Sequence, residues 1–273
     1  MIGGILVEES KALEMIKRIP TIIQNIENPT EEMKLLALSK NGLVLKYIEN
    51  PTEEMQELAI ENNVRAIQYI ENPSEEIMIK AVNQGWSILD YIKNPTDKVI
   101  RLAINQAGWA IQYVKNPSEE LQLLAIEKNY DSLKYIENPS EKVQLEAVKI
   151  SHDALRYLKN SSLEVETLAI KNNESAIQFI KNIDENKIKE FLKANILVIK
   201  YITKDINNID IKEVLKEVLS KEDVDEKYVR DFLHCSIIDR NSDIVQMDKI
   251  MFIHKYGSKK AKKVAVDERL KMI

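Results

Sequence analysis

The sequence predicts an all-α fold, an α-solenoid of eight two-helix repeats with helical caps at both ends. The first observation is a period of 22 residues, which divides residues 26–201 into eight units. The second is that most prolines, each after an asparagine, follow this period, as do an alanine and an aromatic column. The third is composition: 6 glycines and 7 prolines in 273 residues disfavour a collagen-like or turn-rich β chain. The columns are Pro29, Pro51, Pro73, Pro95, Pro117 and Pro139; Ala37, Ala59, Ala81, Ala103, Ala125, Ala147 and Ala169; and Tyr47, Tyr69, Tyr91, Tyr113, Tyr135, Tyr157, Phe179 and Tyr201.

Residues 1–25 resemble a worn repeat and are predicted to cap the first full one. The first helix of each repeat then has two possible starts, shown by residues 28–31. In one register Asn28 is the N-cap, Pro29 takes the first helical position and Glu31 completes a capping box. In the other register Thr30 is the N-cap. Both registers put acidic residues in the first turn, where they complement the helix N-terminus.

The first helix carries a buried stripe at Met33, Leu36 and Ala37 and is expected to stop near Asn41, with a left-handed C-cap. The matching cap positions are Asn63, Gly85, Ala107, Asn129, Ser151, Asn173 and Asn195.

The second helix has its buried columns at Val44, Leu45 and Ile48, and the next Asn-Pro ends it. Two helices this short cannot enclose their own apolar stripe, so the repeats must stack on one another. Beyond residue 201 the period dissolves into amphipathic segments. Residues 202–273 are therefore predicted to be either a helical C-terminal cap or a small separate subdomain.

The repeat resembles the short α-helical tandem repeats of bacterial, phage and giant-virus proteins with the pattern A-V-x-x-N-G-x-A-[IL]-x-[YF]. Residues 37–47 carry that pattern, and residues 59–69 and 169–179 carry it more loosely. The chain is similar, more distantly, to leucine-rich repeat variant and HEAT-like arrays. This resemblance implies a helical solenoid used for binding, and it implies no particular activity.

Two columns of the second helix vary between repeats while the core columns hold steady. At 100° per residue the side opposite the core carries the Leu43 and Lys46 columns. We interpret this side as a recognition face for a protein or peptide, against the alternative that its residues are simply solvated. The predicted partner-binding residues, which include neighbouring aromatic positions, are Arg65, Gln68, Trp86, Asp90, Trp109, Gln112, Tyr113, Tyr130, Asp131, Lys134 and Arg156.

The aromatic residues have structural as well as functional interpretations. The tyrosine ladder is expected mainly to stack between repeats, with hydroxyls that could reach a ligand. Trp86, Trp109, Tyr130 and His152 are expected to gather in the turns between helices of consecutive repeats. There they would form either an interface hot spot or a filling between turns.

Nothing in the sequence supports enzyme activity, a metal site or a cofactor. The three histidines are scattered, and a nucleophile–base pair at His234 and Cys235 is disfavoured because adjacent side chains splay apart. The paired glutamates are explained by helix N-termini. We find no phosphate loop, nucleophile elbow or zinc-protease motif.

The segment 251–273 has seven basic and two acidic residues, a net charge of +5, so the total of −5 leaves −10 on residues 1–250. A basic helix is favoured over a disordered arm because apolar residues are interspersed. The residues of this segment that are candidates for nucleic-acid binding are Lys255, Lys259, Lys260, Lys262 and Lys263.

We therefore expect a non-enzymatic solenoid that binds a protein or peptide through its second helices. The alternatives are a phage-type counter-defence inhibitor that occludes a host protein, and nucleic-acid binding through the basic segment. One cysteine excludes an internal disulfide, and no apolar run reaches bilayer length. We expect a cytoplasmic protein, in the host cytoplasm if phage-encoded, without membrane contact.

Overall fold

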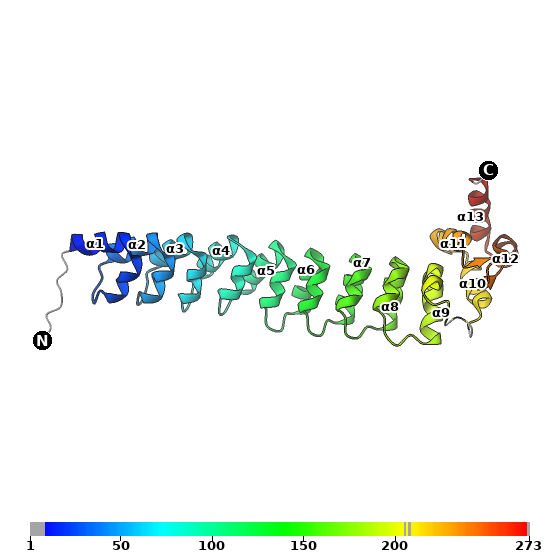
Figure 1. Cartoon of the computed structure of the whole chain (residues 1–273), viewed down its shortest axis with the longest axis horizontal. Helices are drawn as coiled ribbons and strands as arrows, with labels where there is room; N and C mark the ends of the chain where they lie inside the picture. Colours follow the sequence, from blue (N-terminus) through cyan, green and yellow to red (C-terminus); the bar gives the residue numbers. More distant parts are fainter. Residues whose placement is uncertain (1–8, 205, 207–208, 272–273) are drawn as a thin grey trace. The chain divides into compact units, whose positions relative to one another are not determined.

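The computed structural model describes residues 9–204, 206 and 209–271. It is an all-α repeat fold of paired helices, which confirms the predicted fold class (Figure 1). Residue contacts divide the chain into two compact units, Met1–Ile136 and Glu137–Ile273, here called the N-terminal and C-terminal units. No helix in the described part of the chain is long and apolar enough to cross a membrane.

The N-terminal unit holds six pairs, each an α-helix followed by a six-residue 3₁₀-helix (η), and Figure 1 shows them following one another in chain order. The first pair lies in the segment predicted as the N-terminal cap. The helices are α1 (Glu9–Arg18), η1 (Pro20–Asn25), α2 (Glu31–Lys40), η2 (Gly42–Tyr47), α3 (Glu53–Asn62), η3 (Val64–Tyr69), α4 (Glu75–Asn83), η4 (Trp86–Tyr91), α5 (Asp97–Gln106), η5 (Gly108–Tyr113), α6 (Glu119–Lys128) and η6 (Tyr130–Tyr135).

Among its described residues, the C-terminal unit holds three more pairs, then four α-helices and two two-residue strands paired in parallel. Its elements are α7 (Glu141–Ile150), η7 (His152–Tyr157), α8 (Leu163–Asn172), η8 (Glu174–Phe179), α9 (Glu185–Ala194), η9 (Ile196–Tyr201), α10 (Ile211–Leu219), α11 (Glu226–His234), β1 (Ile238–Asp239), β2 (Val245–Gln246), α12 (Lys249–Tyr256) and α13 (Lys259–Leu270).

The first helix of each repeat starts in the second of the two predicted registers. Thr30 is the N-cap of α2, and its hydroxyl accepts a hydrogen bond from the Met33 amide at 3.3 Å. Serine or threonine caps α3 to α8 in the same way. The capping-box register is therefore wrong. The asparagine of each Asn-Pro pair lies in the turn before this cap. Two of these asparagines, Asn50 and Asn116, adopt left-handed φ values of 48° and 49°.

The predicted left-handed C-cap is wrong, because the residue after the first helix has an extended backbone. Asn41 has φ −154° and ψ 101°, and its Oδ1 accepts a hydrogen bond from the Leu43 amide at 3.0 Å. Asn41 is thus the N-cap of the second helix, a position at which asparagine is among the preferred residues. The second helix starts at once from this extended residue and is 3₁₀ throughout, which the sequence reasoning did not foresee.

The core lies between the two helices of each pair and between neighbouring pairs. Val44, Leu45 and Ile48 are buried, as predicted, and the alanine column is completely buried. In the first helix the prediction needs one correction: Leu36 is only half-buried, and Leu38 is fully buried beside Ala37. The small alanine methyl allows adjacent helices to approach closely.

Two glycines are required by close approaches between the backbones of neighbouring repeats. A Cβ atom on Gly42 would lie 2.1 Å from the carbonyl oxygen of Ala59 in the next repeat. Gly108 meets the Ala125 carbonyl at the same distance. In contrast, a Cβ on Gly85 would meet nothing within 4 Å.

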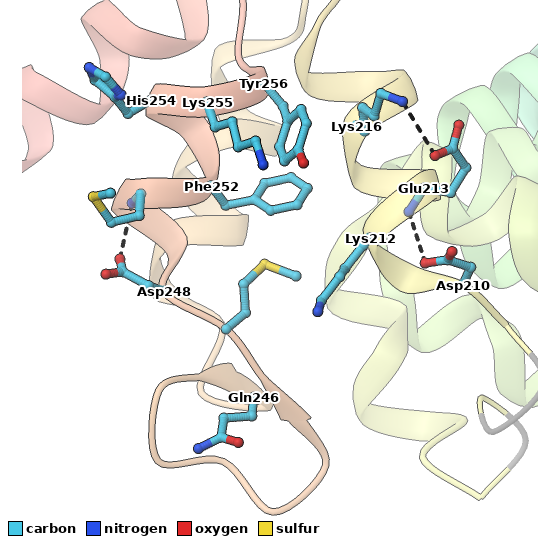
Figure 2. A pocket seen from close by; sticks show the side chains of 12 residues that line it. Asp210, Lys212, Glu213, Lys216, Gln246, Asp248, Phe252, His254, Lys255 and Tyr256 are labelled. Carbon is cyan, nitrogen blue, oxygen red and sulfur yellow. Dashed lines mark hydrogen bonds and ion pairs between the residues drawn. The ribbon is translucent and has the colours of Figure 1, made fainter.

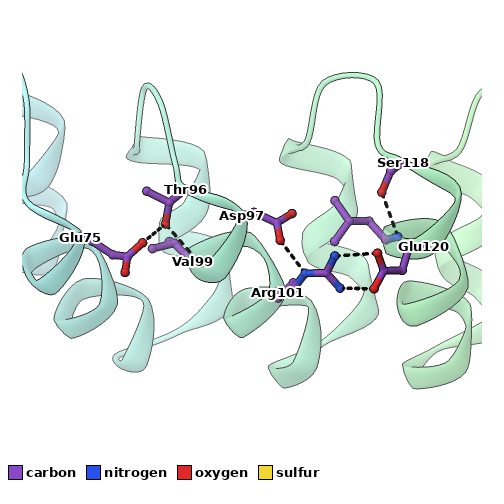
Figure 3. Close-up of polar contacts among 8 residues, drawn as sticks. Glu75, Thr96, Asp97, Val99, Arg101, Ser118 and Glu120 are labelled. Atoms are coloured by element: carbon purple, nitrogen blue, oxygen red, sulfur yellow. Dashed lines mark hydrogen bonds and ion pairs between the residues drawn. The ribbon is translucent and has the colours of Figure 1, made fainter.

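The acidic first turns also join neighbouring repeats (Figure 3). The Thr96 hydroxyl donates a hydrogen bond to Glu75 at 2.6 Å. Arg101 of α5 donates two hydrogen bonds of 2.9 Å to the carboxylate of Glu120 in α6 and one of 2.6 Å to Asp97. Hydrogen bonds and ion pairs between neighbouring repeats therefore engage Glu75 and Glu120.

The end of the C-terminal unit is packed helix on helix. The Tyr228 hydroxyl of α11 donates to the Leu192 carbonyl at 2.8 Å, and burial raises the pKa of this tyrosine. The basic segment is ordered: α13 buries Ala261, Val264 and Ala265. The predicted basic helix is thus confirmed over the disordered arm.

Candidate binding surface

The 3₁₀ geometry places the two variable columns of the second helix on one row. With three residues per turn, side chains at positions i and i+3 eclipse each other, so each Leu43-column residue lies beside its Lys46-column partner. The side-chain amide of Gln112 accordingly donates to the Trp109 carbonyl at 3.0 Å, and Gln68 does the same to Arg65. The predicted spacing of 100° per residue was wrong, and the true geometry draws the two columns together.

The predicted residues divide into exposed and half-buried groups. The exposed ones are Arg65, Asp90, Gln112, Lys134 and Arg156. The half-buried ones are Gln68, Trp86, Trp109, Tyr113, Tyr130 and Asp131. None of them lies in the core of its repeat, so their side chains can vary without loss of the stack.

Three aromatic rings from two successive 3₁₀-helices form a cluster in the N-terminal unit. The ring centroid of Trp86 in η4 lies 6.4 Å from that of Trp109 and 6.1 Å from that of Tyr113, both in η5. These separations are typical of tilted aromatic packing. Burial, followed by the charge of Asp90, raises the pKa of Tyr113. The cluster is thus a partly exposed apolar patch with polar side chains beside it.

The third successive 3₁₀-helix, η6, continues this patch with charged groups. The indole N–H of Trp109 donates to Asp131 at 2.7 Å, and Lys134 pairs with the same carboxylate at 3.1 Å. The Lys134 ammonium also lies 5.9 Å from the centroid of the Trp109 ring. The hydrogen bond to Asp131 raises the pKa of Lys134. These contacts fix the orientation of the Trp109 ring.

The residues of the tyrosine ladder are half-buried or exposed. Tyr69 and Tyr135 are 39% and 40% exposed. The guanidinium of Arg65 lies 5.5 Å from the centroid of Tyr91 in the next repeat. In the C-terminal unit the guanidinium of Arg156, which belongs to the Lys46 column and not to the Leu43 column, lies 4.8 Å from the centroid of Phe179 in the next repeat. Sequence reasoning missed Tyr91 and Phe179 as partners of these arginines, although the 22-residue period places them one repeat further on.

The predicted cluster of turn aromatics is only partly correct. Trp86 and Trp109 meet, but Tyr130 makes no ring contact with another aromatic residue in the described part of the chain. His152 belongs to the C-terminal unit, where its Nε2 lies 3.4 Å from the Ser175 hydroxyl. The side chains of Trp86, Trp109, Tyr130 and His152 therefore do not form one continuous aromatic group.

Among the described residues no three histidine, cysteine or acidic side chains are grouped to hold a metal. Cys235 is buried, whereas the exposed His234 lies 3.6 Å from Glu268 of α13. The side chains of His234 and Cys235 therefore lie in different surroundings, as expected for sequence neighbours.

The basic segment exposes most of its lysines. Lys259, Lys262 and Lys263 lie on the exposed side of α13, Lys260 is half-buried, and Lys255 is exposed on α12. Glu268 of α13 accepts bonds from Lys271 and from Arg230 of α11, at 2.7 and 3.2 Å. These contacts hold the helix on the unit and leave the lysine side in solvent.

A hollow lies between α10 and α12 in the C-terminal unit (Figure 2). It has a volume of about 860 Å³ and includes Lys212 of α10 and Phe252, Lys255 and Tyr256 of α12. The sequence reasoning missed it because these helices fall outside the repeats, where no period relates one position to another.

Comparison with known proteins adds no family assignment: no family model matches the sequence, and neither a curated protein nor a solved structure matches the chain.

Proposed function

We propose that the chain is a non-enzymatic binding protein whose N-terminal unit holds a protein or peptide against the 3₁₀ face. This face is defined as the exposed row of η3 to η6 with the aromatic cluster. The observation that carries the proposal is the cluster of Trp86, Trp109 and Tyr113, which is half-buried, braced by Asp131, and not part of the repeat core. Trp, Tyr and Arg are the residues most enriched where binding energy concentrates.

The charge of the 3₁₀ face favours a protein partner over nucleic acid. Arg65 and Lys134 are balanced by Asp90 and Asp131, and Lys134 is already paired. A surface that binds phosphate backbone carries a clear excess of positive charge. A mixed face with aromatic residues and side-chain amides is instead typical of protein interfaces. Arg156 is proposed as part of the equivalent face of the C-terminal unit.

The test is affinity capture from a nuclease-treated lysate of the organism that encodes the chain, with three baits. The first is the wild type, the second Arg65→Ala/Gln68→Ala/Gln112→Ala/Lys134→Ala, and the third a matched control. The control carries four substitutions at exposed lysines away from this face: Lys40→Ala, Lys93→Ala, Lys115→Ala and Lys128→Ala. We expect a protein that the wild type and the control retain and the face variant loses. A protein retained equally by all three baits contradicts the proposal.

An inhibitor that covers a host protein would use the same face, so this experiment serves that form of the proposal too. Nucleic-acid binding is the second candidate, and the exposed lysines of α13 favour it. It predicts capture that disappears with nuclease, falls steeply with salt, and is lost in Lys259→Gln/Lys262→Gln/Lys263→Gln.

A further inference from the structure

The hollow between α10 and α12 has an apolar floor. Met247 and Phe252 are 7% and 8% exposed, and the ring centroids of Phe252 and Tyr256 lie 4.9 Å apart. Figure 2 shows side chains of α10 and α12 facing each other across it. Its volume, about 860 Å³, suits a few side chains of a bound segment. The hollow belongs wholly to the C-terminal unit and shares no residue with the 3₁₀ face.

The carboxylates that line the hollow are already satisfied. Asp210 accepts a hydrogen bond from the Glu213 amide at 3.1 Å, and Glu213 pairs with Lys216 at 3.6 Å. Asp248 pairs with Arg240 and caps α12 through the Met251 amide. Glu213 and Asp248 are therefore each balanced by a cation, whereas Asp210 is held by a backbone amide.

Two ammonium groups of the lining are not neutralised in this way. Within the described residues, neither Lys212 nor Lys255 has a carboxylate at ion-pair distance. Lys255 instead lies 5.0 Å from the centroid of Tyr256, a ring that Lys216 approaches to 6.0 Å. The hollow thus places two ammonium groups that lack a carboxylate partner among the described residues beside an aromatic floor.

Large apolar side chains are exposed at the same place. Met251, which lines the hollow, is 61% exposed, and its neighbour Ile250 is 39% exposed. Exposed apolar groups gathered beside a hollow mark interaction sites, and methionine adapts well to varied partner side chains.

We propose that this hollow binds an acidic amphipathic segment of a partner protein. Its carboxylates pair with Lys212 and Lys255, and an aromatic or aliphatic side chain packs on Phe252 and Tyr256. The charge complementarity carries the assignment. A nucleic-acid strand fits less well, because a phosphate backbone needs a clear excess of cations, whereas the lining has three lysines and three carboxylates and exposes Met251.

The test is selection of random twelve-residue peptides displayed on phage against the immobilised full chain. We expect enriched peptides that combine aspartate or glutamate with large apolar residues. The same selection on Lys212→Gln/Lys255→Gln should reduce that enrichment at least about tenfold, as expected for loss of about 1.4 kcal/mol of charge pairing. The matched control, Lys259→Gln/Lys263→Gln, removes two exposed charges from α13 outside the hollow and should keep the enrichment.

Two further measurements distinguish the alternatives. Tyr256→Ala should weaken the selected peptides, measured by fluorescence anisotropy, while the circular dichroism spectrum stays unchanged. A labelled twelve-nucleotide poly-dT strand tests the phosphate alternative. The proposal is overturned if acidic peptides are not enriched, if the α13 control loses them equally, or if only the strand binds in a Lys212- and Lys255-dependent way.

Discussion

Replacement of Ser132 by alanine is expected to stabilise the protein, although most core substitutions do the opposite. Ser132 lies in η6 and is completely buried, and its hydroxyl has no hydrogen-bond partner among the described residues. The equivalent positions of other repeats hold Ala66, Ala110 and Ala154, which are also fully buried. The site therefore accepts an alanine without rearrangement.

The magnitude follows from the hydroxyl oxygen alone, because the Cβ atom stays. An unpaired buried hydroxyl costs about 1–3 kcal/mol, and the small void left by the oxygen offsets part of the gain. We expect a net increase of about 1 kcal/mol in the free energy of unfolding. With an m-value of about 3 kcal/mol/M, this raises the urea midpoint by about 0.3 M.

The assay is urea unfolding followed by circular dichroism, with Ser118→Ala as the matched control. Ser118 is also in the N-terminal unit, but its hydroxyl caps α6 by accepting from the Leu121 amide at 3.4 Å. Its loss should lower stability by about 1 kcal/mol. The two Ser→Ala changes should thus move the midpoint in opposite directions. A midpoint for Ser132→Ala at or below that of the wild type refutes the reasoning.

Two more changes test the packing and the electrostatics. Gly42→Ala should lower the free energy of unfolding in urea by about 1–3 kcal/mol, because its Cβ would collide with the Ala59 carbonyl. The control Gly85→Ala should leave the urea midpoint nearly unchanged, because its Cβ would meet nothing within 4 Å. Equal effects of the two changes would contradict the close approach at Gly42. The hydrogen bond from Lys271 holds the pKa of Glu268 below its usual range, so its contribution is present above the unfolded pKa of about 4.3 and disappears as pH falls through the folded pKa. Glu268→Gln should therefore be less stable than the wild type at pH 7, and thermal unfolding should show that difference vanish near pH 2; a difference independent of pH would contradict this assignment.

The repeat could be predicted from the sequence because one solution serves every unit. A position that must be small, as in the Ala37 column, or apolar, as in the Leu45 column, can be recognised because the same residue type recurs every 22 residues. The type of the second helix could not be predicted in the same way. Six residues between an extended asparagine and the next turn suit either helix, and hydrophobic columns at Val44, Leu45 and Ile48 fit both periods.

The binding face was predicted from variation, and its internal contacts were only partly predictable. The period alone relates Trp109 to Asp131, since they are 22 residues apart and occupy one column. It does not show that the indole N–H reaches that carboxylate, because this depends on side-chain rotamers. Neither variation between repeats nor a sequence period indicates the hollow between α10 and α12, because Lys212 and Tyr256 are 44 residues apart in a region without repeats.

The contacts of Trp109 connect the fold to the proposed function. A tryptophan that filled a gap between turns would be buried without a polar partner, yet this indole is half-exposed and held by Asp131 from the next repeat. Lys134 pairs with that same carboxylate and lies over the ring, so the orientation is fixed before any partner arrives. A side chain held in one conformation loses little entropy on binding, which raises affinity without added contact area. The repeat architecture supplies this arrangement because the two residues share a column, and one repeat step brings them together.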